Sequence, residues 1–234
     1  MKKRMWLFLM VIVLAFIDVI CIDHLHAFMA MTSEDSKNNT SGEKDPCGQE
    51  KTDTSYTSGG VPPEEIASVI REELVLFPIP ESGLHTDYRA VFEDSWMSER
   101  TFGGARGHEG TDIMLDPDKR GLFPVLSMTD GTVEKMGWLP QGGYRLGIRS
   151  PGGIYYYYAH LNDYAQDLET GCIVVAGQLL GFAGDSGYSN IEGTVGNFPV
   201  HLHVGIYYHD DQGEETAINP YPFLRLLKKV SIPF

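Results

Sequence analysis

Hydrophobic and polar residues divide this chain into four stretches of different character. An apolar run covers residues 5–22 and is interrupted only by Asp18. Residues 31–60 carry almost no large apolar side chains, so this part cannot bury enough surface to offset the entropy of ordering. We therefore predict a disordered linker over residues 23–61. From Pro62 onward apolar residues recur with regular periods, which indicates folded structure.

The N-terminal run predicts a targeting segment. Lys2, Lys3 and Arg4 precede it, and a basic start followed by an apolar run places residues 1–4 in the cytoplasm and exports the rest. The run is long for the core of a signal peptide, short for a membrane span, and followed by no small-residue cleavage site. A retained signal anchor at residues 5–22 is favoured, and secretion after signal cleavage is the alternative. We expect an extracytoplasmic, membrane-anchored protein.

The folded part begins with one helix and continues with strands. Within residues 62–83, apolar residues at 66, 69, 70 and 74 follow the helical period, which predicts a short helix and a connector. From residue 84 on, short apolar runs are separated by Gly, Pro, Asn and Asp, a pattern typical of strands and turns. The predicted strands are residues 111–115, 123–128, 132–136, 144–149, 154–160, 172–175, 178–183 and 200–208. Residues 222–230 close the domain, in part as a helix. The fold class is mainly β, with an antiparallel sheet, over residues 84–234.

Charge and cysteine content exclude some functions. The formal net charge is -14, and nucleic-acid partners are not expected because such proteins carry basic patches. Cys21, Cys47 and Cys172 form no C-x-x-C pair, so neither a zinc knuckle nor a redox motif is expected. A disulfide between Cys47 and Cys172 is an alternative that we do not favour.

The first candidate for chemistry is the segment at residues 200–206. Side chains alternate along a strand, so residues 200, 202, 204 and 206 form an apolar row, and His201 and His203 share the opposite face. This pattern alone is weak evidence for a metal, because surface histidines produce it too. His24 and His26 form the same H-x-H motif beside the targeting segment.

Two further segments contribute histidines. His108 and Asp112 flank a stretch with Gly110, and both side chains reach one ion if this glycine permits a bend; an ordinary turn is the alternative. The predicted strand at 154–160 ends at His160, and alternation places Tyr158 on the face of that histidine; an aromatic-rich structural strand is the alternative. Taken together, two nitrogens and one carboxylate form a catalytic zinc set with an open fourth position, and two further imidazoles remain as proton carriers.

The order of these motifs resembles the lysostaphin/LytM-type zinc metalloendopeptidases. The shared motifs are H-x-x-x-D, a strand ending in Tyr-x-His-Leu, and H-L-H; the turns at 177–181 and 184–187 and the Asn219-Pro220 step match as well. The segment at 92–112 looks most like the branch that contains the sporulation peptidase LytH. The resemblance covers about residues 88–227.

The resemblance implies a duplicated hybrid motif fold with a groove and one Zn²⁺ held by His108, Asp112 and His203. It assigns catalysis to His160 and His201, and the substrate is expected to be a peptide bond in peptidoglycan, with the stem peptide favoured. Some relatives have lost ligands and serve as scaffolds, so a non-catalytic module that binds peptidoglycan or a partner is the alternative. Every ligand position is filled here, which favours an enzyme.

Candidate substrate-binding residues are Tyr158, Arg106 and Asn219. Tyr158 would line the groove unless it packs within its strand, and Arg106, like Arg100, would meet carboxylates of a stem peptide unless it is solvated. The loop at 188–197 departs from the family's common pattern, so the bond that is cut stays open. The sequence identifies no protein partner.

Overall fold

The computed structural model of the chain describes residues 60–229. The predicted membrane segment and nearly all of the predicted linker lie outside the described residues, as does Cys47, while Cys172 is a free thiol. Among residues 60–229, no helix has the length and apolar character that crossing a membrane requires.

Two short helices flank the strands in sequence. Helix α2 (Glu64–Glu73) follows Pro63, begins with two acidic residues that suit a helix N-terminus, and buries Ala67 and Ile70. Helix α3 (Tyr221–Lys228) begins directly after Pro220 and buries Phe223, Leu224 and Leu227. Both helices were predicted from the sequence.

The remaining elements are strands, most of which the apolar periodicity predicted. Their bounds are β1 (Arg89–Val91), β2 (Glu99–Arg100), β3 (Arg106–Gly107), β4 (Thr111–Asp116), β5 (Pro124–Leu126), β6 (Gly131–Leu139), β7 (Gly143–Arg149), β8 (Tyr155–Tyr164), β9 (Ile173–Val174), β10 (Leu179–Ala183), β11 (His201–His209) and β12 (Glu215–Ile218). Strands β1, β2, β3 and β12 were not predicted, because they are short or lack an apolar alternation.

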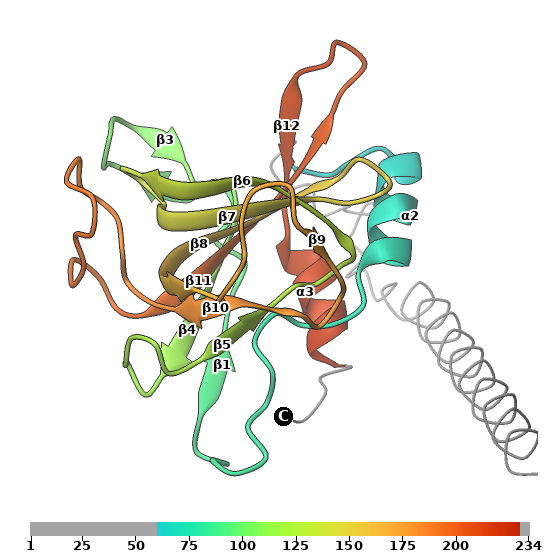
Figure 1. Ribbon diagram of the computed structural model, residues 1–234. Coiled ribbons are helices and arrows are strands. Elements are labelled where there is room, and N and C mark those ends of the chain that lie inside the picture. Colours follow the sequence, from blue (N-terminus) through green and yellow to red (C-terminus); the bar gives the residue numbers. More distant parts are fainter. Residues whose placement is uncertain (1–59, 230–234) are drawn as a thin grey trace, which may run out of the picture. The chain divides into compact units, whose positions relative to one another are not determined.

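Ten strands form one antiparallel sheet, as predicted. The path through it runs β1-β4-β11-β8-β7-β6-β9, with β10 pairing with β5 and β8, and β12 pairing with β11. Strands β2 and β3 form a separate two-stranded sheet. Figure 1 shows α2 on one side of the fold and β3, together with the long loop before β11, on the opposite side.

The central strands have one apolar face and one polar face. The apolar face belongs to a single core cluster, to which both helices contribute and in which Leu146, Tyr156 and Leu202 are fully buried. The opposite face of β4, β11 and β8 carries Asp112, His203 and Tyr157. The strands that bury the core therefore also carry the polar groups of the candidate site.

A bulge in β8 changes which tyrosine faces the site. Tyr144 pairs with Leu161 and Leu146 pairs with Tyr158, so two residues of β8 stand opposite one residue of β7. The second of them, His160, has a φ of 62°, which L-residues rarely adopt. The alternation therefore breaks before His160. The prediction that Tyr158 lines the groove is wrong, because this side chain is 0% exposed and its hydroxyl accepts a hydrogen bond from the Met128 N–H.

Candidate metal centre

Strand pairing brings the first two predicted ligands together. His203 of β11 stands directly opposite Asp112 of β4 in the register of the two strands. Residues in such cross-strand pairs have their Cβ atoms about 5 Å apart and their side chains on one face. The Nδ1 atom of His203 lies 2.9 Å from Oδ1 of Asp112. The pairing of β4 and β11 therefore positions two of the three ligands.

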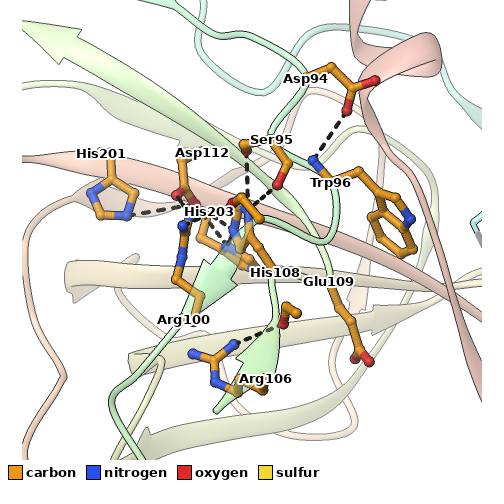
Figure 2. A network of polar contacts seen from close by, with 12 residues as sticks. Asp94, Ser95, Trp96, Arg100, Arg106, His108, Glu109, Asp112, His201 and His203 are labelled. Carbon is orange, nitrogen blue, oxygen red and sulfur yellow. Dashed lines mark hydrogen bonds and ion pairs between the residues drawn. The ribbon is translucent and has the colours of Figure 1, made fainter. Parts of the chain in front are cut away.

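The third ligand comes from the loop between β3 and β4. The backbone of His108 is held on both sides, since its N–H donates to the Ser98 carbonyl and its carbonyl accepts from the Met97 N–H. Its Nε2 atom lies 3.1 Å from Oδ1 of Asp112 and 3.0 Å from Nδ1 of His203. Figure 2 shows the three side chains converging.

The far side of the His108 ring contacts Ser95. Its Nδ1 atom lies 3.2 Å from the carbonyl oxygen and 3.1 Å from the hydroxyl of Ser95. A carbonyl oxygen only accepts, so Nδ1 carries the proton of the neutral ring and Nε2 turns a lone pair toward the cluster. A partner of this kind fixes the tautomer and orientation of metal-binding histidines.

The cluster fits zinc in its donor set and its spacing. His108, Asp112 and His203 each offer one ligand atom, and these atoms lie within 4.8 Å of one another. Two imidazole nitrogens and one carboxylate oxygen are a common protein set for catalytic zinc. Ligand atoms at ordinary zinc distances in a tetrahedron stand about 3.3 Å apart. The separations of 2.9–3.1 Å require only a small expansion.

Gly110 is needed for space rather than for a bend. It is not among the glycines with positive φ. A Cβ atom at this position would lie 2.5 Å from Nε2 of His203 and 2.7 Å from the carbonyl oxygen of Val204. Only glycine therefore leaves room for the His203 ring.

Arg100 holds the outer oxygen of the ligand carboxylate. Its Nη2 donates to Oδ2 of Asp112 at 2.8 Å, which leaves Oδ1 toward the two histidines. Burial by itself would raise the pKa of Asp112, but the neighbouring His108 and His203 side chains lower this pKa well below its ordinary value. Burial lowers the pKa of His203, against the opposing effect of Asp112. These directions favour a carboxylate and a neutral imidazole, the forms that bind a metal.

His160 and His201 lie beside the cluster with matching tautomers. Nδ1 of His160 lies 2.7 Å from the Ser186 carbonyl oxygen, and Nδ1 of His201 lies 2.8 Å from the Pro199 carbonyl oxygen. Each Nδ1 is therefore the donor, and each Nε2 keeps a lone pair when the ring is neutral. The two rings are 4.7 Å apart between centroids, and Nε2 of His201 lies 3.8 Å from Oδ1 of Asp112.

Aromatic side chains enclose His160. Its ring packs edge-on against Phe198 and Tyr188, with centroids 4.7 Å and 5.7 Å away, and Tyr188 stacks on Phe102. His160 is only 4% exposed. Burial, followed by the neighbouring His201 and His203, lowers its pKa well below the ordinary value. His160 is thus neutral at pH 7.

A pocket adjoins the cluster and contains one of the three predicted substrate residues, Arg106. Its lining includes His108, His160 and His203 together with Arg106 and Tyr157.

Asn219 has a different place among the described residues. Its Nδ2 donates to the carboxylate of Asp94 at 3.1 Å and 3.3 Å, and its Oδ1 accepts from the Tyr221 N–H. Asp94 also accepts from the Trp96 N–H (Figure 2). The structure therefore places Asn219 against the segment that carries Ser95, where it ties this segment to the start of α3.

Four side chains at the site were not assigned from the sequence. Ser95 and Arg100 contact ligands, while Tyr157 and Arg145 line the pocket. Arg100 appeared only as a residue for substrate carboxylates, and no local pattern marks Ser95. The signal for Tyr157 was obscured by the bulge, because alternation counted back from His160 selects Tyr158.

Comparison with known proteins gives a consistent family match. Residues 106–220 match the profile of Peptidase family M23. The chain is 46% identical over 149 residues to an "L-Ala--D-Glu endopeptidase" of Bacillus subtilis (strain 168), an alignment that covers 64% of this chain and 42% of that protein. It is 29% identical over 120 residues to lysostaphin of Staphylococcus staphylolyticus, which covers 50% of this chain and 22% of the relative.

A solved structure shares the fold. A candidate glycyl-glycine endopeptidase, lytM, from Ruminococcus gnavus ATCC 29149 is 51% identical, with a TM-score of 0.67 and coverage of 73% of this chain and 66% of that one. The chain spans less than half the length of the two curated relatives, the Bacillus subtilis endopeptidase and lysostaphin.

Proposed function

We propose that this chain is a zinc-dependent endopeptidase, which hydrolyses a peptide bond in peptidoglycan. The premise is that the chain belongs to peptidase family M23, among the lysostaphin/LytM-type metallopeptidases. The observation that carries this proposal is the convergence of His108, Asp112 and His203, with His160 and His201 beside them. The names of the relatives point to two bonds, L-Ala–D-Glu and glycyl-glycine. We favour the stem peptide, because the motif neighbourhood at residues 92–112 resembles the LytH branch.

His108, Asp112 and His203 would hold the zinc ion. When bound, zinc supplies Lewis acidity, which polarises a carbonyl and lowers the pKa of a water toward about 7. Arg100 and Ser95 keep the carboxylate and the His108 ring in their orientations. Such partners matter, since their loss typically reduces metal affinity or activity about 10–100-fold.

His160 and His201 would handle the protons. Each has its Nδ1–H fixed by a carbonyl oxygen, so each can accept a proton at Nε2. His160 is neutral at pH 7 because burial lowers its pKa, and the same burial makes its protonated form a ready donor to the leaving amine. General acid–base groups contribute about 10²–10⁴-fold to rate.

The place of action is part of the proposal. The basic start and the apolar run at residues 5–22 would anchor the chain on the outer side of the cytoplasmic membrane. A random-coil linker of about thirty residues would reach roughly 30 Å on average. The domain would then search the wall layer next to the membrane during growth, division or sporulation.

Zymography on purified cell wall tests the activity. We expect the full chain loaded with zinc to clear the wall, and chelation to abolish clearing. His160→Ala and His201→Ala should keep one zinc per protein and lose most turnover, whereas His203→Ala should lose both. A zinc-loaded wild-type protein that clears nothing would instead support the scaffold alternative. Mass spectrometry of released muropeptides would identify the bond.

A further inference from the structure

The pocket beside the metal cluster continues over a surface rich in tyrosine and arginine. The Tyr157 ring lies edge-on to His203 at 5.8 Å between centroids, and further ring contacts join Tyr157 to Tyr207 and Tyr207 to Tyr155. Arg106 of β3 and Arg145 of β7 line the same pocket. A peptide with its scissile bond at the metal cluster would therefore extend along the tyrosines and pass these guanidinium groups.

The two arginines have polar atoms without partners. Nε of Arg106 and Nη1 of Arg145 are buried and form no hydrogen bond, and Arg106 has one long contact of 3.5 Å from Nη1 to the Gly107 carbonyl oxygen. Within residues 60–229, no ion pair joins either guanidinium to a carboxylate. Burying charged donors without partners costs free energy, so this arrangement favours a ligand that provides acceptors.

Arg149 shows what an arginine with a structural role looks like in the same strand. It lies four residues after Arg145 in β7 and forms ion pairs with Glu134 and Glu215. The pocket also contains Glu109 and Glu215, but Glu215 is engaged by Arg149, and Glu109 is exposed and directed away from the metal cluster. In a chain with a formal net charge of -14, acidic partners are abundant, yet these two guanidinium groups have none among the described residues.

Tyr157 connects the arginines to the reacting centre. Tyr157 lines the same pocket as Arg106 and Arg145, and its ring packs edge-on against the ligand His203. The backbone of Gly142 approaches the Tyr157 hydroxyl closely, and its carbonyl accepts from the His160 N–H. A carboxylate bound by the two arginines would thus lie next to the residue at the scissile bond.

We propose that Arg106 and Arg145 form a carboxylate-binding subsite that selects peptides with an anionic residue adjacent to the scissile bond. This inference rests on the proposed endopeptidase function. A glutamyl residue whose nitrogen belongs to the scissile amide keeps one free carboxylate, whichever of its two carboxyl groups continues the chain. A glycine bridge has no such group. The planar guanidinium fork suits a carboxylate, which it binds through paired hydrogen bonds.

Two synthetic peptides test the subsite in the unaltered protein. Both contain an L-Ala–D-Glu bond, and they differ only in whether the free carboxylate of the glutamyl residue is kept or converted to a carboxamide. We expect the zinc-loaded full chain to cleave the carboxylate peptide with a kcat/KM about 10–100-fold higher, the range for loss of a hydrogen bond to a charged group. Equal kcat/KM values would overturn the proposal.

Variants locate the effect. Arg145→Gln and Arg106→Gln should lower kcat/KM for the carboxylate peptide and leave the carboxamide peptide nearly unchanged, and Arg145→Lys should retain part of the preference. Arg225→Gln, on the exposed side of α3, is the matched control and should behave as wild type. An equal loss on both peptides would indicate a structural role and overturn the assignment.

Binding separates this proposal from the proposed function. Calorimetry with zinc-loaded His201→Ala protein measures the affinity for the two peptides without turnover. Tighter binding of the carboxylate peptide supports the subsite even if the wild-type protein cleaves neither peptide, an outcome that would count against the endopeptidase. Equal affinities would reject the subsite even if both peptides are cleaved.

Discussion

Replacing Gly110 by alanine should weaken zinc binding although none of the three ligands is substituted. The new Cβ atom would lie 2.5 Å from Nε2 of His203, whereas non-bonded heavy atoms are normally at least about 3.5 Å apart, so the ring must retreat by about 1 Å. Metal sites tolerate deviations of only about 0.2 Å in ligand distance. The backbone of β11 would have to move as well, because the new Cβ atom would lie 2.7 Å from the carbonyl oxygen of Val204.

We expect Gly110→Ala to lose at least about 100-fold in zinc affinity, at the upper end of the range for outer-shell changes because a ligand itself is displaced. Overpacking should also lower the free energy of unfolding by about 1–3 kcal/mol. Zinc content after dialysis against a graded chelator and thermal unfolding with and without zinc would measure both effects.

The matched control is Gly104→Ala. A Cβ atom there meets nothing within 4 Å, and the positive φ of Gly104 confines any cost to the local backbone. This variant should keep one zinc per protein and full turnover. If Gly110→Ala bound zinc as tightly as wild type and cleaved normally, the His203 ring would not need the space that Gly110 leaves, which would refute the prediction.

Three further predictions follow from the same contacts. The acid limb of the kcat/KM profile should lie below the ordinary histidine pKa of 6.5, because the lowered pKa keeps His160 neutral until the pH falls well below that value. Phe198→Ala lets water reach the His160 ring and should move this limb to higher pH, which pH profiles with parallel zinc analysis would show. Arg100→Gln should weaken zinc binding about 10–100-fold, and unchanged affinity in a competition titration would deny it an orienting role. Tyr158→Phe should cost about 1–3 kcal/mol of unfolding free energy, since the buried Met128 N–H loses its acceptor, yet leave kcat/KM intact; a large kinetic defect at normal stability would contradict its placement in the core.

Strand periodicity predicted most of the sheet because the same contacts that bury apolar side chains produce it. Leu202 and Val204 are fully buried, and His201 and His203 share the other face, as alternation requires. The antiparallel fold and the convergence of His108 with Asp112 and His203 were also expected before the structure. Short strands such as β12 were missed because a four-residue strand paired on one side needs no apolar alternation.

The details of the site depend on features that a period of two cannot express. A single left-handed residue, His160, shifts the face of every position counted from it, so Tyr158 was selected where Tyr157 lies in the pocket. Gly110 was predicted to permit a bend, but its function is to leave space for a side chain 93 positions later in the chain. Contacts of that range arise from strand order, which the sequence pattern does not specify.

The distribution of site residues over the fold separates metal binding from substrate choice. Asp112 and His203 are neighbours across two central strands, and the His108 loop is tied to the Ser95–Ser98 segment by backbone hydrogen bonds, so the cluster has little freedom to change. In contrast, Tyr188 and Phe198 enclose His160 from the loop before β11, and the two arginines line the pocket from β3 and β7, which carry no ligand. Changes at these outer positions would alter which peptide fits while the ligands stay in place. Such a division would let related proteins cut different bonds, as the names "L-Ala--D-Glu endopeptidase" and "glycyl-glycine endopeptidase" of two similar proteins indicate.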